Sequence, residues 1–173
     1  MARDALKTLF HPFDTATLDA PGAEQKVLFL GAEAGFRLPE GFAADIACVQ
    51  GFRPVFNRLA ASGATATPAA EGSDYDLALV LCDKFKGGNE ARVAEALKRT
   101  KPGAMLVLAG AKEDGIEALR KRIAKLGVPV EHMPKYHGQA VWFVRPDNAD
   151  ALAAALAPEP AMVEDRFRTA PGM

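Results

Sequence analysis

The chain of 173 residues lacks a long apolar run, and this absence excludes one class of protein at once. No stretch approaches the roughly 18–20 consecutive apolar residues that a membrane-spanning helix needs. The first residues, MARDALKTLFHPF, are too charged and too poor in apolar side chains for a secretory signal. We therefore expect a cytoplasmic protein that has no membrane partner.

Cysteine is also scarce, because the chain contains only Cys48 and Cys82. Both lie in apolar runs typical of strands, where a reduced cysteine is more often a small core residue than a bridge, a metal ligand or a nucleophile. No internal repeat is present, and we expect no metal site. The sequence predicts one domain over residues 1–157, with a helical or irregular lead-in over residues 1–25, and a linker over residues 158–173.

Positive charge is unevenly distributed, although the whole chain has a net charge of -1. Residues 1–83 hold 6 Lys and Arg against 11 Asp and Glu, residues 84–145 hold 13 against 6, and residues 146–173 hold 2 against 5. The middle segment is therefore basic. This asymmetry permits a nucleic-acid footprint, but a run such as RKRIAKLG (residues 120–127) is more commonly the solvated face of a helix.

Strand-like and helix-like segments alternate, which predicts βαβ units and a largely parallel sheet. Strands are predicted at residues 26–31, 45–51, about 64–70, 76–82 and 104–110. Helices are predicted at residues 53–63, 89–103, 113–127 and 147–157, with Pro102 and Gly103 ending the second of them. Apolar spacings of three and four assign the buried helix faces to Val55, Phe56, Leu59, Ala60, Val93, Ala96, Leu97, Ile116, Leu119, Ile123 and Leu126.

Two further strand-like runs, residues 128–133 and 140–145, are joined only by PKYHGQ. This connection is too short for a parallel crossover and suits an antiparallel hairpin. Five alternating units closed by a hairpin match the methyltransferase-like variant of the nucleotide-binding fold. We therefore predict an α/β fold with three layers, Rossmann-related, whose mixed sheet is mostly parallel with an antiparallel C-terminal hairpin.

In such a fold, glycines in the loop after the first strand let the backbone approach a cofactor. The stretch VLFLGAEAGF (residues 27–36) has Gly31 and Gly35, but Glu33 lies between them. Two like charges about 4 Å apart, at an effective dielectric constant of about 20, repel by roughly 4 kcal/mol. An inward-pointing Glu33 would therefore exclude the carboxylate of S-adenosylmethionine, and the two glycines would serve only the turn and its packing.

Two other positions lack the residues that a working site needs. The second strand ends in Gln50, an amide that accepts a hydrogen bond from a ribose hydroxyl without the help of a charge. The fourth strand runs into CDKFKGG, where Asp83 and Phe85 are suitable but both prolines of an Asn/Asp-Pro-Pro-aromatic turn are missing. We predict that the fold is kept and the site is lost, so that this domain binds no cofactor.

Several longer strings carry a resemblance to a known family: VLFLGAEAGF, VQGFRP, YDLALVLCDKFKGGNEARVAEAL, PGAMLVLAGAKEDGIEAL and KYHGQAVWFV. GAKEDGI (residues 110–116) and YHGQAVWF (residues 136–143) are the more specific parts. From about residue 26 to the end, the chain resembles the N-terminal domain of the tandem-domain (C-type) bacterial 16S ribosomal RNA guanine-N2 methyltransferases. Its last residues, RTAPGM, are similar to the junction with the family's catalytic half.

The resemblance implies two methyltransferase-like domains, of which the C-terminal one binds S-adenosylmethionine and methylates a guanine amine in 16S ribosomal RNA. The N-terminal copy is degenerate, has no catalytic residue to carry over, and assists RNA recognition and folding of the catalytic half. The basic segment then becomes a candidate phosphate-binding surface. Its candidate residues lie in loops at the carboxyl edge of the predicted sheet, and they are Lys84, Lys86, Lys112, Lys135 and His137.

Two alternatives stay open from the residues. The domain could be a free-standing S-adenosylmethionine-dependent methyltransferase with an atypical cofactor loop, or a protein-interaction module that docks through its vacant sheet edge. His137 either stacks on a base or caps its turn, and Trp142 is expected in a core or interface. The basic run at residues 120–122 is expected to be a solvated helix face.

Overall fold

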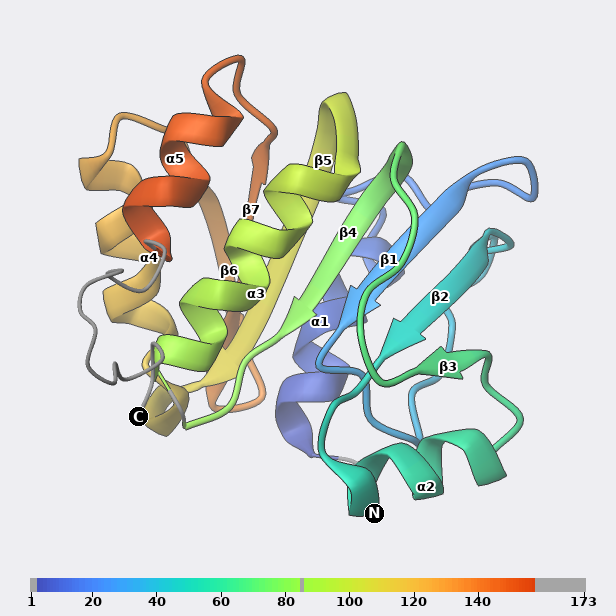
Figure 1. Ribbon diagram of the computed structural model, residues 1–173. Coiled ribbons are helices and arrows are strands. Elements are labelled where there is room, and N and C mark those ends of the chain that lie inside the picture. Colours follow the sequence, from blue (N-terminus) through green and yellow to red (C-terminus); the bar gives the residue numbers. More distant parts are fainter. Residues whose placement is uncertain (1–2, 85, 158–173) are drawn as a thin grey trace, which may run out of the picture.

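In the computed structural model, which describes residues 3–84 and 86–157 except the side chain of Lys86, the chain forms one seven-stranded sheet (Figure 1). The strands are β1 (Lys26–Leu30), β2 (Asp45–Val49), β3 (Ala66–Thr67), β4 (Tyr75–Leu81), β5 (Thr100–Ala111), β6 (Glu131–Lys135) and β7 (Gly138–Val144). The helices are α1 (Asp4–Asp14), α2 (Arg53–Ala61), α3 (Lys86–Arg99), α4 (Ile116–Lys125) and α5 (Ala149–Leu156). A 3-10 turn, η1 (Lys112–Asp114), precedes α4.

The strands lie in the order β3-β2-β1-β4-β5-β7-β6. The pairs from β3 to β5 are all parallel, whereas β7 runs antiparallel to both of its neighbours, β5 and β6. The two-residue connection between β6 and β7 makes the predicted hairpin. The predicted fold class is therefore confirmed.

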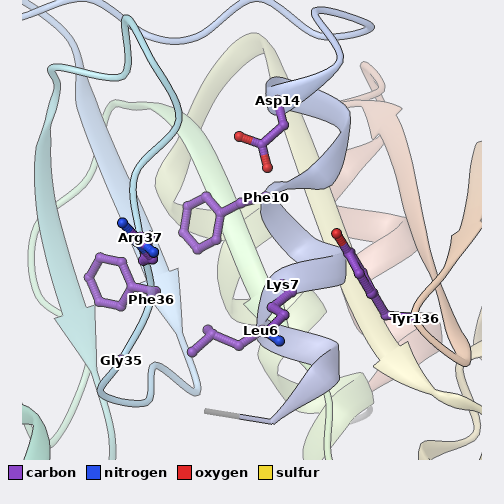
Figure 2. Close-up of a pocket in the computed structure, with 8 residues that line it drawn as sticks. All are labelled: Leu6, Lys7, Phe10, Asp14, Gly35, Phe36, Arg37 and Tyr136. Atoms are coloured by element: carbon purple, nitrogen blue, oxygen red, sulfur yellow. The ribbon is translucent and has the colours of Figure 1, made fainter. Parts of the chain in front are cut away.

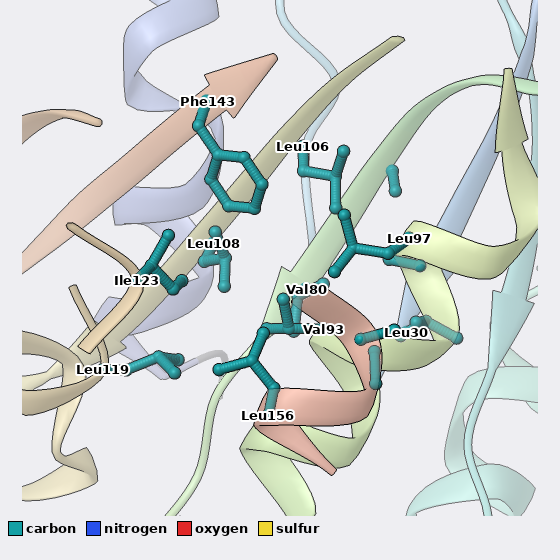
Figure 3. Packing of buried hydrophobic residues seen from close by; sticks show 14 of the residues in the cluster. Leu30, Val80, Val93, Leu97, Leu106, Leu108, Leu119, Ile123, Phe143 and Leu156 are labelled. Atoms are coloured by element: carbon teal, nitrogen blue, oxygen red, sulfur yellow. The ribbon is translucent and has the colours of Figure 1, made fainter. Parts of the chain in front are cut away.

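Helices cover both faces of the sheet and produce two buried clusters. On one face, α3 packs on β4 and β5, α4 packs on β5 and β7, and α5 packs against α3. Their buried cluster includes Leu97, Leu106, Leu108, Ile123 and Leu156 (Figure 3). Burying one such side chain contributes about 1.5–3 kcal/mol, so this face supplies much of the driving force for folding. On the other face, α1 and the buried Leu59 of α2 cover a second cluster. The sheet and the helices on its two faces form the three predicted layers.

The helix α1 covers a face that the chain leaves without a crossover helix. Residues 31–44, which connect β1 to β2, form no helix, although a parallel crossover is usually helical. The ring of Phe10 in α1 lies 5.9 Å from that of Phe29 in β1, 5.7 Å from that of Phe36 and 5.8 Å from that of Phe42. Residues predicted only as a lead-in thus include a core helix that holds the β1–β2 connection against the sheet.

Several details of the sequence prediction are wrong. The β1–β2 and β3–β4 crossovers contain no helix, so the expected five βα units are incomplete. The second predicted helix ends at Arg99, and β5 begins at Thr100 and includes the Pro102-Gly103 pair expected to end that helix. The register between β4 and β5 shifts in this region, because Thr100 lies opposite Tyr75 and the regular pairing resumes only at Met105. Pairing with β4 therefore ends the helix earlier than predicted and draws the Pro102-Gly103 pair into the strand.

Two helices bury less than their apolar spacing indicates. In α2 only Leu59 is buried, whereas Val55 and Phe56 are half-buried and Ala60 is exposed. This helix lies beside β3, a strand of only two residues, which offers little sheet surface to cover it (Figure 1). Leu126, just after α4, is also exposed.

Both cysteines are core residues, as the sequence indicates. Cys48 belongs to the cluster under α1 and Cys82 to the cluster under α3. Burial raises the pKa of the Cys48 thiol to about 11 and, as the largest cause, that of the Cys82 thiol to about 12. Both thiols are therefore protonated near neutral pH and are unsuited to act as nucleophiles. Trp142 is buried in the same cluster as Cys48.

The close approach of β5 and β7 at Gly138 yields a prediction for stability. A Cβ atom at this position would overlap the carbonyl oxygen of Gly110 and lie 3.0 Å from the Cα of Ala111. Backbone atoms of a central strand cannot move aside easily, so we expect Gly138→Ala to lower the free energy of unfolding by about 1–3 kcal/mol in urea denaturation. Gly51→Ala is the matched control, because its Cβ would make only an ordinary contact, 3.5 Å from the Pro68 oxygen. Equal losses in the two variants would contradict the prediction.

Candidate functional site

The strand order identifies one position where a ligand is expected. From β1 the chain moves outward to β2 and β3, and it then returns to β4 on the other side of β1. In open α/β sheets, ligands bind beyond the carboxyl ends of the strands at such a topological switch point. Here this point lies where Leu30 ends β1 and Leu81 ends β4, next to the predicted loop of Gly31, Glu33 and Gly35.

Arg92 of α3 occupies the space beside Gly31. Its guanidinium donates to the carbonyl oxygen of Leu81 at 2.8 Å and to the Asp83 carboxylate at 3.1 Å. Gly31 has a φ of +75°, and a Cβ atom there would lie 2.7 Å from the Leu81 oxygen and 2.9 Å from an Arg92 nitrogen. The turn and this close packing are sufficient reasons for a glycine. Gly35 also has a positive φ, +98°, and is exposed.

Arg3, just before α1, binds Glu33 on the neighbouring side of the switch point. Its Nε and Nη2 donate to the two carboxylate oxygens of Glu33 at 3.0 and 2.8 Å. The same guanidinium donates to the carbonyl oxygen of Cys82 at 3.1 Å and to the Asp114 carboxylate at 3.3 Å. We call Arg3, Glu33 and Asp114 the arginine bridge, since they connect α1, the loop after β1 and the end of β5.

The arginine bridge changes how Glu33 acts. Burial alone would lower the pKa of the Arg3 guanidinium, but the hydrogen bond and charge of Glu33, together with Asp114 and Asp83, raise the pKa above its ordinary value. Glu33 is therefore paired with a permanent cation and does not present the uncompensated negative charge that the sequence argument assumed. A cofactor at the loop after β1 would therefore be obstructed by the paired side chains of Arg3 and Glu33, and not simply repelled by a negative charge.

A buried hydrogen-bond network holds the carboxylate of Asp114, the second anion of the arginine bridge. Asp114 is buried, and its Oδ2 accepts the backbone N–H of Ala111 at 2.8 Å as well as the Arg3 guanidinium. The buried amide of Asn89 donates to the carbonyl oxygens of Asp83 at 2.6 Å and of Asp114 at 3.2 Å, and it accepts the N–H of Asp83 at 2.9 Å. The ends of β4 and β5 are thus connected to α3 through side chains whose hydrogen bonds are satisfied.

Gln50 uses its amide inside the chain. Its side-chain nitrogen donates to the carbonyl oxygen of Ala32 at 3.0 Å, and its side-chain oxygen accepts the N–H of Phe52 at 2.9 Å. The residue is buried. A ribose would have to replace both bonds, so in this conformation Gln50 holds the loop after β1 to the end of β2.

The candidate RNA-binding residues come together along the carboxyl edge of the sheet. Lys84 follows β4, Lys112 follows β5, Lys135 ends β6, and His137 lies in the β6–β7 turn; all four are exposed. The N–H of Lys112 donates to the carbonyl oxygen of His137 at 3.3 Å, so the loop after β5 contacts the hairpin turn. Lys86 begins α3, and its side chain and Phe85 lie outside the described residues.

The cations of α4 are partly engaged elsewhere. Lys121 pairs with Glu117 at 3.1 Å on the exposed surface, and Arg122 pairs with Glu90 of α3 at 3.0 Å. Arg122 also donates to the carbonyl oxygen of Ala155 at 2.6 Å and so holds α5. These contacts favour the interpretation of this helix face as a solvated surface.

Two absences hold for residues 3–84 and 86–157. None of the helices in this part of the chain is both long and apolar enough to cross a membrane. Within the same residues, no group of three or more His, Cys, Asp or Glu side chains is arranged to hold a metal ion.

Sequence reasoning missed the side chains that close the switch point. Arg3 pairs with a residue 30 positions away and another 111 positions away, and a single arginine carries no local pattern that would reveal such partners. Arg92 lies on α3, whose apolar face was predicted. The sequence did not indicate that the polar face of this helix contacts the end of β4. Glu33 was the one available signal, because a carboxylate in a glycine loop requires a counter-ion.

Together, the strand order, the antiparallel β7 and the position of the switch point define the fold of S-adenosylmethionine-dependent methyltransferases. A Thermus thermophilus 16S rRNA N2 G1207 methyltransferase, in complex with AdoMet and guanosine, matches with a TM-score of 0.59 and 20% identity over 80% of this chain. This chain covers 39% of that protein. A TehB-like methyltransferase from Corynebacterium glutamicum matches with a TM-score of 0.57 and 11% identity, covering 84% of this chain and 89% of its own.

An N-methyltransferase, NodS from Bradyrhizobium japonicum, also matches, with a TM-score of 0.53 and 14% identity over 71% of this chain and 86% of its own. At such identities the likeness shows the fold. No protein-family model and no curated protein sequence matches the chain.

Removing Arg3 should destabilise the domain measurably. Arg3→Ala removes the ion-pair partner of Glu33 and leaves the buried Asp114 carboxylate with one hydrogen bond fewer. Since Arg3 is itself about one third exposed, at 36%, we expect a loss of about 1–3 kcal/mol in the free energy of unfolding. Arg53→Ala, at an exposed position in α2, is the control and should stay within about 0.5 kcal/mol of the parent. The role assigned to the bridge is wrong if both variants unfold at the parent's urea concentration.

Proposed function

We propose that this chain is the non-catalytic N-terminal domain of an S-adenosylmethionine-dependent 16S rRNA guanine-N2 methyltransferase. In this role it helps to hold the ribosomal RNA and assists folding of a C-terminal catalytic half, which carries the cofactor. The sequence resemblance supports the domain assignment. The likeness to the Thermus thermophilus enzyme supports the methyltransferase class. That enzyme is more than twice as long as the part that this chain covers, which agrees with a chain that is one domain of a longer protein.

The observation that carries the proposal is the arginine bridge at the switch point. In this fold the cofactor approaches the backbone between the ends of β1 and β4. That space holds the guanidinium groups of Arg3 and Arg92, which bind the carbonyl oxygens of Cys82 and Leu81. The cofactor would have to separate a bidentate ion pair and uncover two strand-end carbonyls, so binding would carry a large added cost.

The charge of the carboxyl edge supports a role in RNA recognition. Lys84, Lys112 and Lys135 are exposed there, and no described carboxylate lies within ion-pair distance of them. Free ammonium groups are available to phosphates, which supply most of the sequence-independent affinity for RNA. The carboxyl edge lies next to the switch point. If Arg3 and Arg92 keep a cofactor out of the switch point, this edge remains available to a large ligand such as RNA.

The first experiment tests the loss of the cofactor site. Because the bridge fills the switch point, isothermal titration with S-adenosylmethionine should give no binding heat, while a cofactor-binding methyltransferase of the same fold gives a normal isotherm in the same buffer. Glu33→Gly and Arg3→Ala should also fail to bind, since Arg92 and Gln50 remain in place. A micromolar dissociation constant for the parent chain, lost in Arg3→Ala, would show instead that Arg3 is a cofactor ligand and would favour a free-standing methyltransferase.

The second experiment tests RNA binding by the carboxyl edge. Fluorescence anisotropy with a 16S rRNA fragment should show affinity that falls with salt, and changing Lys84, Lys86 and Lys112 to Glu should weaken it. The slope of the logarithm of affinity against that of salt concentration should become shallower by about 1 for each phosphate that the variant no longer binds. The matched control changes Lys98, Lys121 and Lys125, exposed on α3 and α4, to Glu. Equal weakening by the two triple variants would remove the assignment to this edge.

A further inference from the structure

The β6–β7 turn has an unusual sequence for its backbone. Lys135 pairs with Gly138 across the turn, and the two residues between them, Tyr136 and His137, have φ values of +56° and +64°. Two-residue turns of this kind strongly prefer Asn-Gly, because a left-handed backbone is unfavourable for bulky side chains. Such strain tends to persist where a side chain has a function. The Tyr136 side chain is therefore a candidate for one, and the residue is 40% exposed.

Cationic side chains surround the Tyr136 ring. The Nζ of Lys7 lies 5.9 Å and that of Lys135 lies 5.4 Å from the ring centroid, and the His11 ring meets it edge-on with its centroid 5.7 Å away. Lys7 and His11 come from α1, which Thr8 fixes to the hairpin through a hydrogen bond of 3.0 Å to the carbonyl oxygen of Lys135. The arrangement is thus held by two elements that are far apart in the sequence.

A cavity of about 270 Å³ opens beside this ring. Figure 2 shows α1 between Tyr136 on one side and the Phe36-Arg37 segment on the other, with Phe10 directed toward Phe36. The Phe10 and Phe36 rings are stacked, with centroids 5.7 Å apart and planes at 17°, so this wall is preformed. Asp14, also of α1, lines the same cavity. We call this site the Tyr136 pocket.

The charges and the size of the Tyr136 pocket select its ligand. Two cations, Lys7 and Arg37, and one carboxylate, Asp14, line the aromatic cavity, and the ammonium group of Lys135 lies over the Tyr136 ring. None of these three cations has a carboxylate within ion-pair distance among the described residues. The volume is slightly below the roughly 300 Å³ at which pockets for drug-sized molecules begin, so it suits one base better than a complete cofactor. An aromatic platform with cations at its rim is the usual arrangement for an unpaired nucleotide.

We infer that the Tyr136 pocket binds one unpaired nucleotide of an RNA strand. The base stacks on Tyr136, and the flanking phosphates lie at Lys7, Lys135 and Arg37. At an exposed ring a cation–π contact is weaker than base stacking, so the base displaces the two ammonium groups from the ring toward the phosphates. Asp14 can accept a hydrogen bond from a base N–H. This inference rests on the proposed function, because it specifies how the same carboxyl edge distinguishes single-stranded RNA from duplex.

The experiment uses a short single-stranded RNA that contains one 2-aminopurine, whose fluorescence falls when the base stacks, and the same RNA annealed to its complement. The parent chain should quench the single strand and not the duplex. Tyr136→Ala should abolish the quenching and weaken single-strand binding roughly 5- to 140-fold, the range that loss of one stacked base implies. Tyr136→Phe, which keeps the ring, is the matched control and should bind like the parent.

A second variant separates binding from folding. Tyr136→Asn combined with His137→Gly relieves the strained turn, so its urea midpoint should equal or exceed that of the parent while single-strand binding falls as in Tyr136→Ala. Parent affinity retained in both ring-deleting variants, with the lysine variants of the carboxyl edge still impaired, would overturn the pocket and leave the proposed function standing. No binding of either RNA form by the parent would overturn both.

Discussion

The ion pair between Arg3 and Glu33 is the interaction on which the carboxyl edge of this sheet depends. The strand ends gather three carboxylates, on Glu33, Asp83 and Asp114, close to the carbonyl oxygens of Leu81 and Cys82. Two guanidinium groups compensate these carboxylates. Arg3 pairs with Glu33 and Asp114, and Arg92 pairs with Asp83. Because a guanidinium is a planar, permanently charged donor of several hydrogen bonds, it can replace a bound ligand as the group that satisfies such an edge. In this structure, side chains of the chain itself therefore compensate the carboxylates at the edge.

The position of α1 explains why the bridge is possible. The β1–β2 connection has no helix, and α1 supplies the missing cover from the N-terminus, anchored by Phe10 among the aromatic rings. This places Arg3 at the strand ends and Lys7 beside the hairpin. The helix contacts β4, β5 and β7, which are encoded much later in the chain. It can dock only when these strands are assembled, so the bridge and the hairpin surface depend on completion of the whole sheet.

Local pattern was enough to predict most of the sheet. The strands β1 and β4 are apolar on both sides and are bounded by polar or glycine residues, so their ends fall within about one residue of the prediction. The faces of α3 and α4 followed from apolar spacing, and Val93, Leu97 and Ile123 are buried as expected. The Pro-Gly pair at the start of β5 was misread, because a helix stop and a bulged strand look the same until pairing decides between them.

The candidate site was harder to predict, since its decisive contacts join residues far apart in the sequence. Glu33 and Gln50 were predicted to be unsuitable for a cofactor, but their partners, Arg3 and the loop carbonyl of Ala32, could come only from the structure. Likewise, His137 was identified from its chemistry, whereas Tyr136 gained interest only when its backbone conformation and neighbours were known.

The two outermost strands restrict how this domain can join another. At one edge β3 has only two residues, and at the other β6 contains Pro134, which has no N–H to donate. Both are devices that prevent an additional strand from extending a sheet. A domain that joins this one would therefore contact it through helices or loops and would not extend its sheet.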